Sequence, residues 1–62
     1  MKQQALTRRE RQIAHLAAEG SSTKAIATRL QISNRTVDNH LSSTYRKLGI
    51  NSREELPEAL QG

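Results

Sequence analysis

The chain has 62 residues, with ten Lys or Arg against six Asp or Glu for a formal net charge of +4, and it has no cysteine. This length allows one small domain, and without cysteine there is no disulfide and no cysteine-ligated zinc site, so helix packing must supply the core. The apolar runs are at most three residues long, whereas a membrane span needs about 20. We therefore expect a cytoplasmic protein with no membrane association.

The charge is unevenly distributed along the chain. Residues 1–53 carry all ten basic residues and three acids, a net +7, and residues 54–62 carry a net −3. A basic body favours a polyanionic partner, because each phosphate neutralised by Lys or Arg releases condensed counterions. Many small basic proteins have basic surfaces that contact only solvent. The residue pattern, and not the charge alone, must therefore show whether this protein has a polyanionic partner.

The first predicted helix covers residues 8–19. Thr7 and Glu10 have the spacing of a capping box, in which each residue satisfies the backbone of the other. Gly20 is suited to the left-handed conformation that ends helices. Between them runs an apolar stripe at helical spacing, formed by Ile13, Leu16 and Ala17.

Two further helices are predicted over residues 23–30 and 34–48, with a tight connection of three residues, 31–33, between them. The expected N-caps are Ser22 and Ser33. In the longer helix an apolar stripe recurs at helical spacing before Gly49, a residue typical of helix ends. The stripe consists of Val37, Leu41, Tyr45 and Leu48.

A last helix is predicted near the C-terminus, but its start is ambiguous. Ser52 and Glu55 have capping-box spacing. A helix that began there would hold Pro57 at its fifth position, where the missing N–H and the ring cost about 3 kcal/mol. The helix is therefore short, kinked or restarted at Pro57, and we expect Leu56 and Leu60 to pack on the core. The predicted fold is all-α, with a three-helix core and a short, Pro-interrupted fourth helix.

Two helices joined by a short turn form a helix-turn-helix, whose second helix lies in the DNA major groove. A helical wheel with Leu41 as the core direction leaves the opposite side of residues 34–48 polar and basic, which suits phosphates and base edges. This outer side comprises Arg35, Thr36, Asn39, Ser43, Arg46 and Lys47. Solvated surface helices are also polar on one side, and many three-helix bundles bind proteins.

A family resemblance favours DNA. The segments Leu6–Glu10, Ile26–Ala27, Ile32–Ser33, Thr36–Val37, His40–Leu41 and Lys47–Ile50, together with Gly20, Lys24, Leu30 and Arg53, resemble the landmarks of the LuxR/FixJ-type helix-turn-helix domain. The similarity covers about residues 6–56 without a gap. It implies a four-helix DNA-binding domain, here residues 6–62, preceded by a disordered start or the boundary of a longer protein over residues 1–5.

The resemblance also implies the residues that meet DNA. Asp38, Asn39 and Ser42 stand where family members approach base edges, with Asn39 expected as the principal reader, and we add Arg35 as a base contact. The resemblance places near the phosphate backbone Lys24, Ser33, Arg35, Thr36, His40 and Lys47. We add Ser43 and Arg46 as phosphate contacts, because both lie on the outer side of the helical wheel.

Four positions depart from the family pattern. Asp38 replaces a common Lys and either accepts from a cytosine amino group or braces Arg35. Ala25 removes a capping partner of Ser22, and Thr44 replaces an aliphatic residue, so its hydroxyl needs a partner such as the carbonyl four residues back. Pro57 puts in question the dimer contact that the last helix commonly supplies in the family.

The sequence thus predicts sequence-specific binding to double-stranded DNA by the output domain of a bacterial transcription regulator. We expect an inverted-repeat operator, a homodimer on DNA, a monomer in isolation, a possible contact with RNA polymerase and association with the nucleoid. The alternative is a basic helical module that contacts polymerase or another acidic protein. No enzyme activity, cofactor or metal is expected, because the two histidines lie on different predicted helices and no nucleophile has a base within reach.

Overall fold

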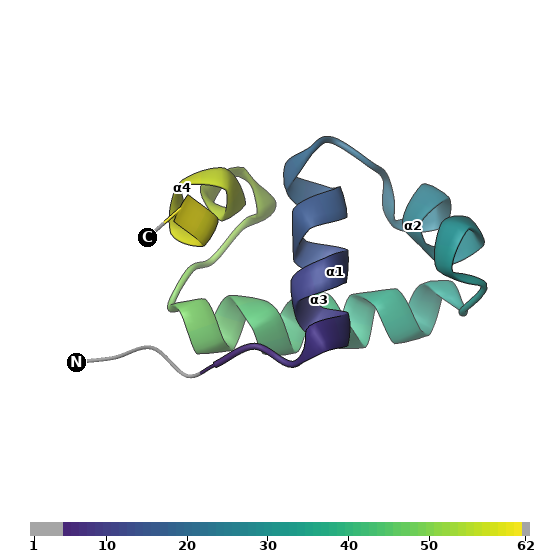
Figure 1. The fold of residues 1–62 in the computed structure, drawn as a ribbon, viewed down its shortest axis with the longest axis horizontal. Coiled ribbons are helices and arrows are strands. Elements are labelled where there is room, and N and C mark those ends of the chain that lie inside the picture. Colours follow the sequence, from purple (N-terminus) through teal and green to yellow (C-terminus); the bar gives the residue numbers. More distant parts are fainter. Residues whose placement is uncertain (1–4, 62) are drawn as a thin grey trace.

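The computed structural model describes residues 5–61, and these form four α-helices and one 3-10 turn (Figure 1). In chain order they are α1 (Arg8–Ala18), α2 (Thr23–Leu30), α3 (Asn34–Leu48), the 3-10 turn η1 (Arg53–Glu55) and α4 (Leu56–Gln61). The all-α prediction and the predicted bounds of the first three helices are confirmed to within a residue. Residues 1–4, most of the expected disordered start, lie outside the described part.

Local side-chain caps explain why the helices begin where they do. The hydroxyl of Thr7 accepts from the Glu10 N–H at 3.0 Å, and Glu10 Oε1 accepts from the Thr7 N–H at 2.9 Å, which completes the predicted capping box. Ser22 accepts from the Ala25 N–H and Ser33 from the Thr36 N–H, each at 3.0 Å. Such caps satisfy N–H groups that have no partner within the helix.

The first three helices are each followed by a residue in the left-handed conformation, and one of these three residues was not predicted from the sequence. Gly20 and Gly49 have φ of +102° and +72°, as predicted. Gln31 also adopts a left-handed conformation, with φ of +60°, at the turn between α2 and α3. A residue with a Cβ is strained in this conformation relative to glycine.

The last helix restarts at the proline. Ser52 makes no capping hydrogen bond to the backbone, so the Ser52–Glu55 capping box was wrong. Glu55 Oε2 instead accepts from the Asn51 N–H at 3.0 Å. After η1, α4 begins at Leu56 and holds Pro57 in its first turn, where a missing N–H costs nothing.

The core lies where α1 crosses the longer α3, with α2 and α4 covering the two ends (Figure 1). Its largest fully buried apolar side chains are Ile13, Ile26, Val37 and Leu56, one from each α-helix. Leu60 is half-buried and packs against this core, as expected. Since each helix alone is too short to be stable in water, burial of these four side chains holds the helices together. The outer side of α3 is therefore presented by a fixed frame.

Candidate nucleic-acid-binding surface

Helix α3 exposes one continuous polar strip, which we call the outward face. Its residues are Arg35, Asp38, Asn39, Ser42 and Arg46, all exposed. The opposite side of α3 buries Val37, Leu41 and Thr44. At about 100° per residue, the centre of the buried side lies about 30° from Leu41, the residue on which the wheel was centred. This rotation brings Asp38 out to solvent, in agreement with the position that the family resemblance gave it.

The same rotation turns a second strip of α3 partly inward. This inner flank consists of Thr36, His40, Ser43 and Lys47, which recur at helical spacing and are each half-buried. The wheel had placed Thr36, Ser43 and Lys47 on the outer side, and their partial burial corrects that prediction. The cause is that α1 crosses α3 on this flank.

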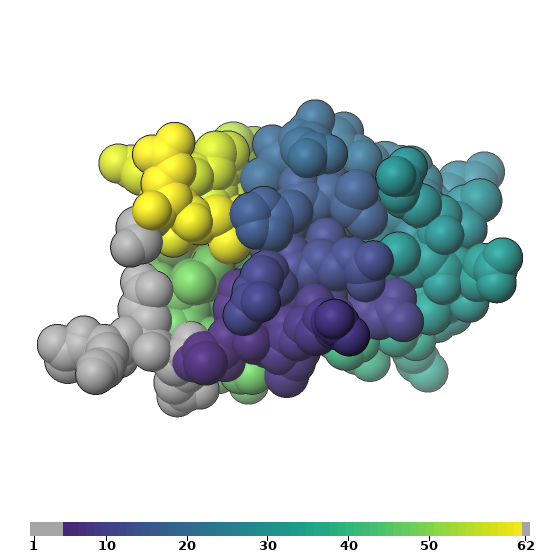
Figure 2. Space-filling model, in the orientation of Figure 1, coloured from purple at the N-terminus to yellow at the C-terminus, as the bar shows by residue number. Residues whose placement is uncertain are grey.

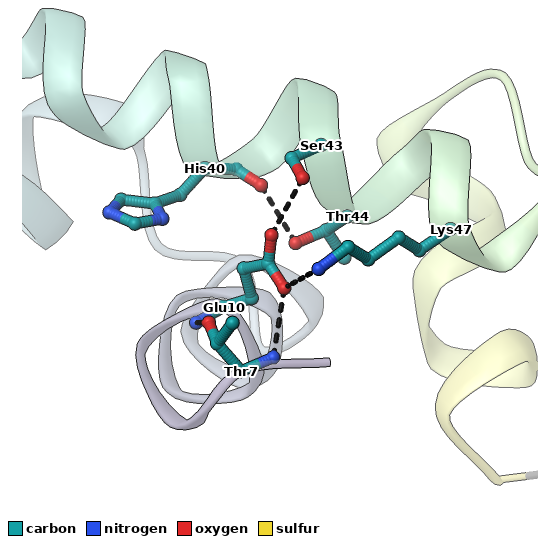
Figure 3. A network of polar contacts seen from close by, with 6 residues as sticks. All are labelled: Thr7, Glu10, His40, Ser43, Thr44 and Lys47. Carbon is teal, nitrogen blue, oxygen red and sulfur yellow. Dashed lines mark hydrogen bonds and ion pairs between the residues drawn. The ribbon is translucent and has the colours of Figure 1, made fainter. Parts of the chain in front are cut away.

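Glu10 of α1 reaches the inner flank and binds two of its residues (Figure 3). Ser43 Oγ donates to Glu10 Oε2 at 2.7 Å, and Lys47 Nζ donates to Glu10 Oε1 at 2.8 Å. Glu10 is only 4% exposed, although it is charged. Its two carboxylate oxygens therefore accept from the α1 cap and from α3 at once, which fixes α1 against α3.

This environment lowers the pKa of Glu10 from 4.5 to about 2. The largest cause is the hydrogen bond from Lys47, followed by those from Ser43 and from the Thr7 backbone, and burial acts in the opposite direction. Because the folded state prefers the charged carboxylate, Glu10 stabilises the fold above its ordinary pKa. The shift corresponds to about 3 kcal/mol at neutral pH.

Sequence reasoning identified Glu10 as a cap and missed its role between helices. The partners are 33 and 37 residues away, so no local spacing connects them. One signal was present: Glu10 is one of only three acids in a segment with ten basic residues. An acid among many basic residues is a candidate for an internal ion pair.

The other predicted phosphate contacts lie on α2 and along the N-terminal half of α3. Ser33 Oγ shares a hydrogen bond of 2.9 Å with Thr36 Oγ1 in addition to capping the helix. Lys24 is exposed in the first turn of α2. His40 is half-buried, and its backbone carbonyl accepts from the buried Thr44 hydroxyl at 2.7 Å, the partner expected for Thr44.

Arg53 ties the C-terminal part of the domain to the connection between α1 and α2. Its guanidinium donates to the Ser21 carbonyl and, at 3.4 Å, to the Thr23 hydroxyl.

Among residues 5–61, no helix is long and apolar enough to cross a membrane. The same residues contain no group of three or more His, Cys, Asp or Glu placed to hold a metal ion.

Comparison with known proteins places this chain in a family. Residues 4–58 match the family model described as bacterial regulatory proteins, luxR family. The chain is 55% identical over 51 residues to a protein of Aeromonas salmonicida named as an HTH-type transcriptional regulator, with 82% of this chain and 26% of that protein covered.

Two further relatives have individual names. The spore germination protein GerE of Bacillus subtilis is 44% identical over 50 residues, which cover 81% of this chain and 68% of GerE. The transcriptional regulatory protein UhpA of Escherichia coli is 42% identical over 55 residues, which cover 89% of this chain and 28% of UhpA. The chain therefore spans about a quarter of the length of two of these relatives and about two thirds of GerE.

Proposed function

The chain belongs to the luxR family of bacterial regulatory proteins, and on that premise we propose that α3 of this helix-turn-helix domain enters the major groove of its DNA site. The outward face of α3 carries this proposal. It has two arginines, an asparagine, an aspartate and a serine, all exposed and without an apolar residue among them. Such side chains match the donors and acceptors at base edges and the phosphates beside the groove.

Asn39 is proposed to make the main contact with a base, and Arg35, Asp38 and Ser42 are proposed to make the others. We call these four residues the reading set. An asparagine amide matches adenine with two hydrogen bonds, and Asn39 lies opposite the buried side of α3. Arg35 fits guanine or a phosphate, and Asp38 fits a cytosine amino group. The expected brace between Asp38 and Arg35 is not formed, because the ion pair found among residues 5–61 joins Lys47 to Glu10. Ser42 completes the set.

Phosphate contacts are proposed to flank this reading set. Lys24 in the first turn of α2 and Arg46 in the last turn of α3 are exposed cations, and Ser33, Thr36 and His40 lie at the N-terminal half of α3. Ser43 and Lys47 are bound to Glu10, so a phosphate must share these two side chains with a buried carboxylate. We therefore expect Ser43 and Lys47 to contribute less to phosphate binding than Lys24 and Arg46.

The larger assembly is part of the proposal. We propose that the domain is the output part of a longer cytoplasmic regulator that works at the nucleoid and meets RNA polymerase at promoters. Two copies would read an inverted repeat, since a two-fold dimer matches a two-fold site. The isolated domain is expected to be monomeric, because α4 has only six residues and its Leu56 is already buried in the core.

DNA titration across salt tests the proposal. A labelled duplex selected from a random library and a scrambled duplex of equal length are each titrated with the domain. We expect the affinity for both to fall linearly with salt on logarithmic axes, and the selected duplex to bind at least about 1,000-fold more tightly at physiological salt. Binding that ignores salt, or equal affinity for both duplexes, would rule the proposal out.

Substitution of Asn39 tests the reading set. Asn39→Ala should cost about 1 to 3 kcal/mol of discrimination at one base pair and leave thermal unfolding unchanged. Asn51→Ala is the matched control, because Asn51 is also exposed but follows α3 in a loop. If Asn39→Ala weakens the selected and scrambled duplexes equally, Asn39 is not a base reader.

A further inference from the structure

Helix α1 has a basic surface that the DNA-binding proposal does not use. Arg8, Arg11, Gln12 and His15 line a shallow hollow of about 520 Å³ on the outside of α1, and all four are exposed. They recur at helical spacing over two turns, so they form one strip, which we call the α1 strip.

The α1 strip faces away from the core and from α3. The other side of α1 buries Glu10, Ile13, Ala14 and Ala17, and through that side α1 packs on α3. In Figure 2 the surface of α1, purple to blue, faces the viewer and covers the middle of α3. Packed helices lie about 8 to 10 Å apart, so a full helix separates the α1 strip from the groove that α3 would occupy.

The cations of this strip have no acidic partner within the described chain. The ion pair found among residues 5–61 joins Lys47 to Glu10. Glu10, the one acid in the first turn of α1, is buried and turned toward α3. Arg8 and Arg11 therefore present free guanidiniums one helical turn apart, and a guanidinium binds a carboxylate with two parallel hydrogen bonds.

We propose that the α1 strip is a docking surface for an acidic segment of a partner protein, and that this partner binds while α3 is on DNA. The occupant has carboxylates about one helical turn apart, the spacing of Arg8 and Arg11. A protein segment fits better than a phosphate backbone, because the strip lies on the side of α1 remote from α3. The inference rests on the assignment of α3 as the DNA surface, so the two are tested by separate readouts.

The test is an NMR titration of the labelled domain in complex with the selected duplex. The probe is a helical peptide of about 15 residues with glutamate at every third or fourth position. We expect amide shifts that concentrate at Arg8, Arg11, Gln12 and His15 while the DNA-bound signals of α3 stay in place. Shifts confined to α3, with release of the duplex, would show that the peptide merely competes for the DNA surface and would overturn the proposal.

A matched pair of charge reversals sharpens the test. Arg8 and Arg9 are adjacent and exposed in the first turn of α1, but only Arg8 lines the hollow. Arg8→Glu should weaken the peptide at least about fivefold, and Arg9→Glu should weaken it less than about twofold. Equal effects of the two reversals would mean that the peptide is attracted by the overall positive charge of the domain and not by a defined docking site, which would contradict the proposal.

DNA affinity, measured on the same variants, separates the two proposals. Both reversals should change the affinity for the selected duplex by less than about threefold, equally for the two, as expected for distant charges. A larger loss for Arg8→Glu than for Arg9→Glu would mean that the α1 strip meets the phosphate backbone, which would overturn the docking proposal and leave the role of α3 intact. Failure of the unsubstituted domain to prefer the selected duplex would instead count against the DNA-binding proposal.

Discussion

The outward face and the inner flank of α3 run along the same helix with similar residue types, but they have different roles. Within residues 5–61, no side chain of the outward face makes a hydrogen bond or an ion pair. On the inner flank, Ser43 and Lys47 hydrogen-bond to Glu10 at 2.7 and 2.8 Å. A polar residue on a recognition helix is therefore not a DNA contact by default, because a neighbouring helix can bind it first.

The largest expected effect comes from Glu10. Glu10→Ala should destabilise the domain by about 3 kcal/mol, because it removes the charged partner of Lys47 and half of the α1 cap. Urea unfolding at neutral pH measures the change. Glu19→Ala, at the exposed end of α1, is the control and should stay within about 0.5 kcal/mol. A loss below about 1 kcal/mol for Glu10→Ala would mean that the inner flank does not need its carboxylate.

The pH dependence of stability follows from the same residue. The pKa of Glu10 is lowered from 4.5 to about 2, so its contribution is complete above about pH 4.5 and disappears as the pH falls toward 2. Glu10→Gln cannot titrate at this position. The difference in unfolding free energy between the parent and Glu10→Gln should therefore shrink by about 3 kcal/mol between pH 6 and pH 2. A constant difference would contradict the lowered pKa.

Arg46 and Lys47 are neighbours on α3 and provide a direct comparison of the two strips. Arg46→Met should lower the salt slope of DNA binding by about 0.9 and leave stability within about 0.5 kcal/mol. Lys47→Met should destabilise the domain by about 1 to 3 kcal/mol, because it leaves Glu10 buried without its cation, and should change the slope by less than half as much. The reverse pattern would mean that Lys47 leaves Glu10 for a phosphate.

The smallest effect is expected at the turn before α3. Gln31→Gly should stabilise the domain by about 0.5 to 1 kcal/mol, because glycine adopts the left-handed conformation of Gln31 without strain. Thermal unfolding measures the gain, and Asn34→Gly, in the first turn of α3, should instead destabilise. Stabilisation without a change in the discrimination of DNA sites would show that the turn affects stability and not the reading set.

The fold was predictable from sequence wherever local chemistry determines it. Thr7, Ser22 and Ser33 cap helices by contacts to residues three positions on, and such spacings are visible in a sequence. The 3-10 turn and the left-handed Gln31 were not foreseen, because glutamine, unlike glycine, gives no signal for a left-handed conformation. Of the surface, the outward face was largely predicted, although a wheel centred on Leu41 placed the half-buried Thr36, Ser43 and Lys47 on the outer side. Their positions depend on where α1 crosses α3, which no local pattern encodes.

One measurement tests the central claim most directly, that the outward face of α3 binds DNA while the inner flank holds the fold. The labelled domain is titrated with the selected duplex, and its backbone and side-chain NMR signals are followed. We expect the largest changes at Arg35, Asp38, Asn39, Ser42 and Arg46, with the Ser43 and Lys47 contacts to Glu10 retained. Changes that concentrate on α1 or α4, with α3 unaffected, would contradict the account.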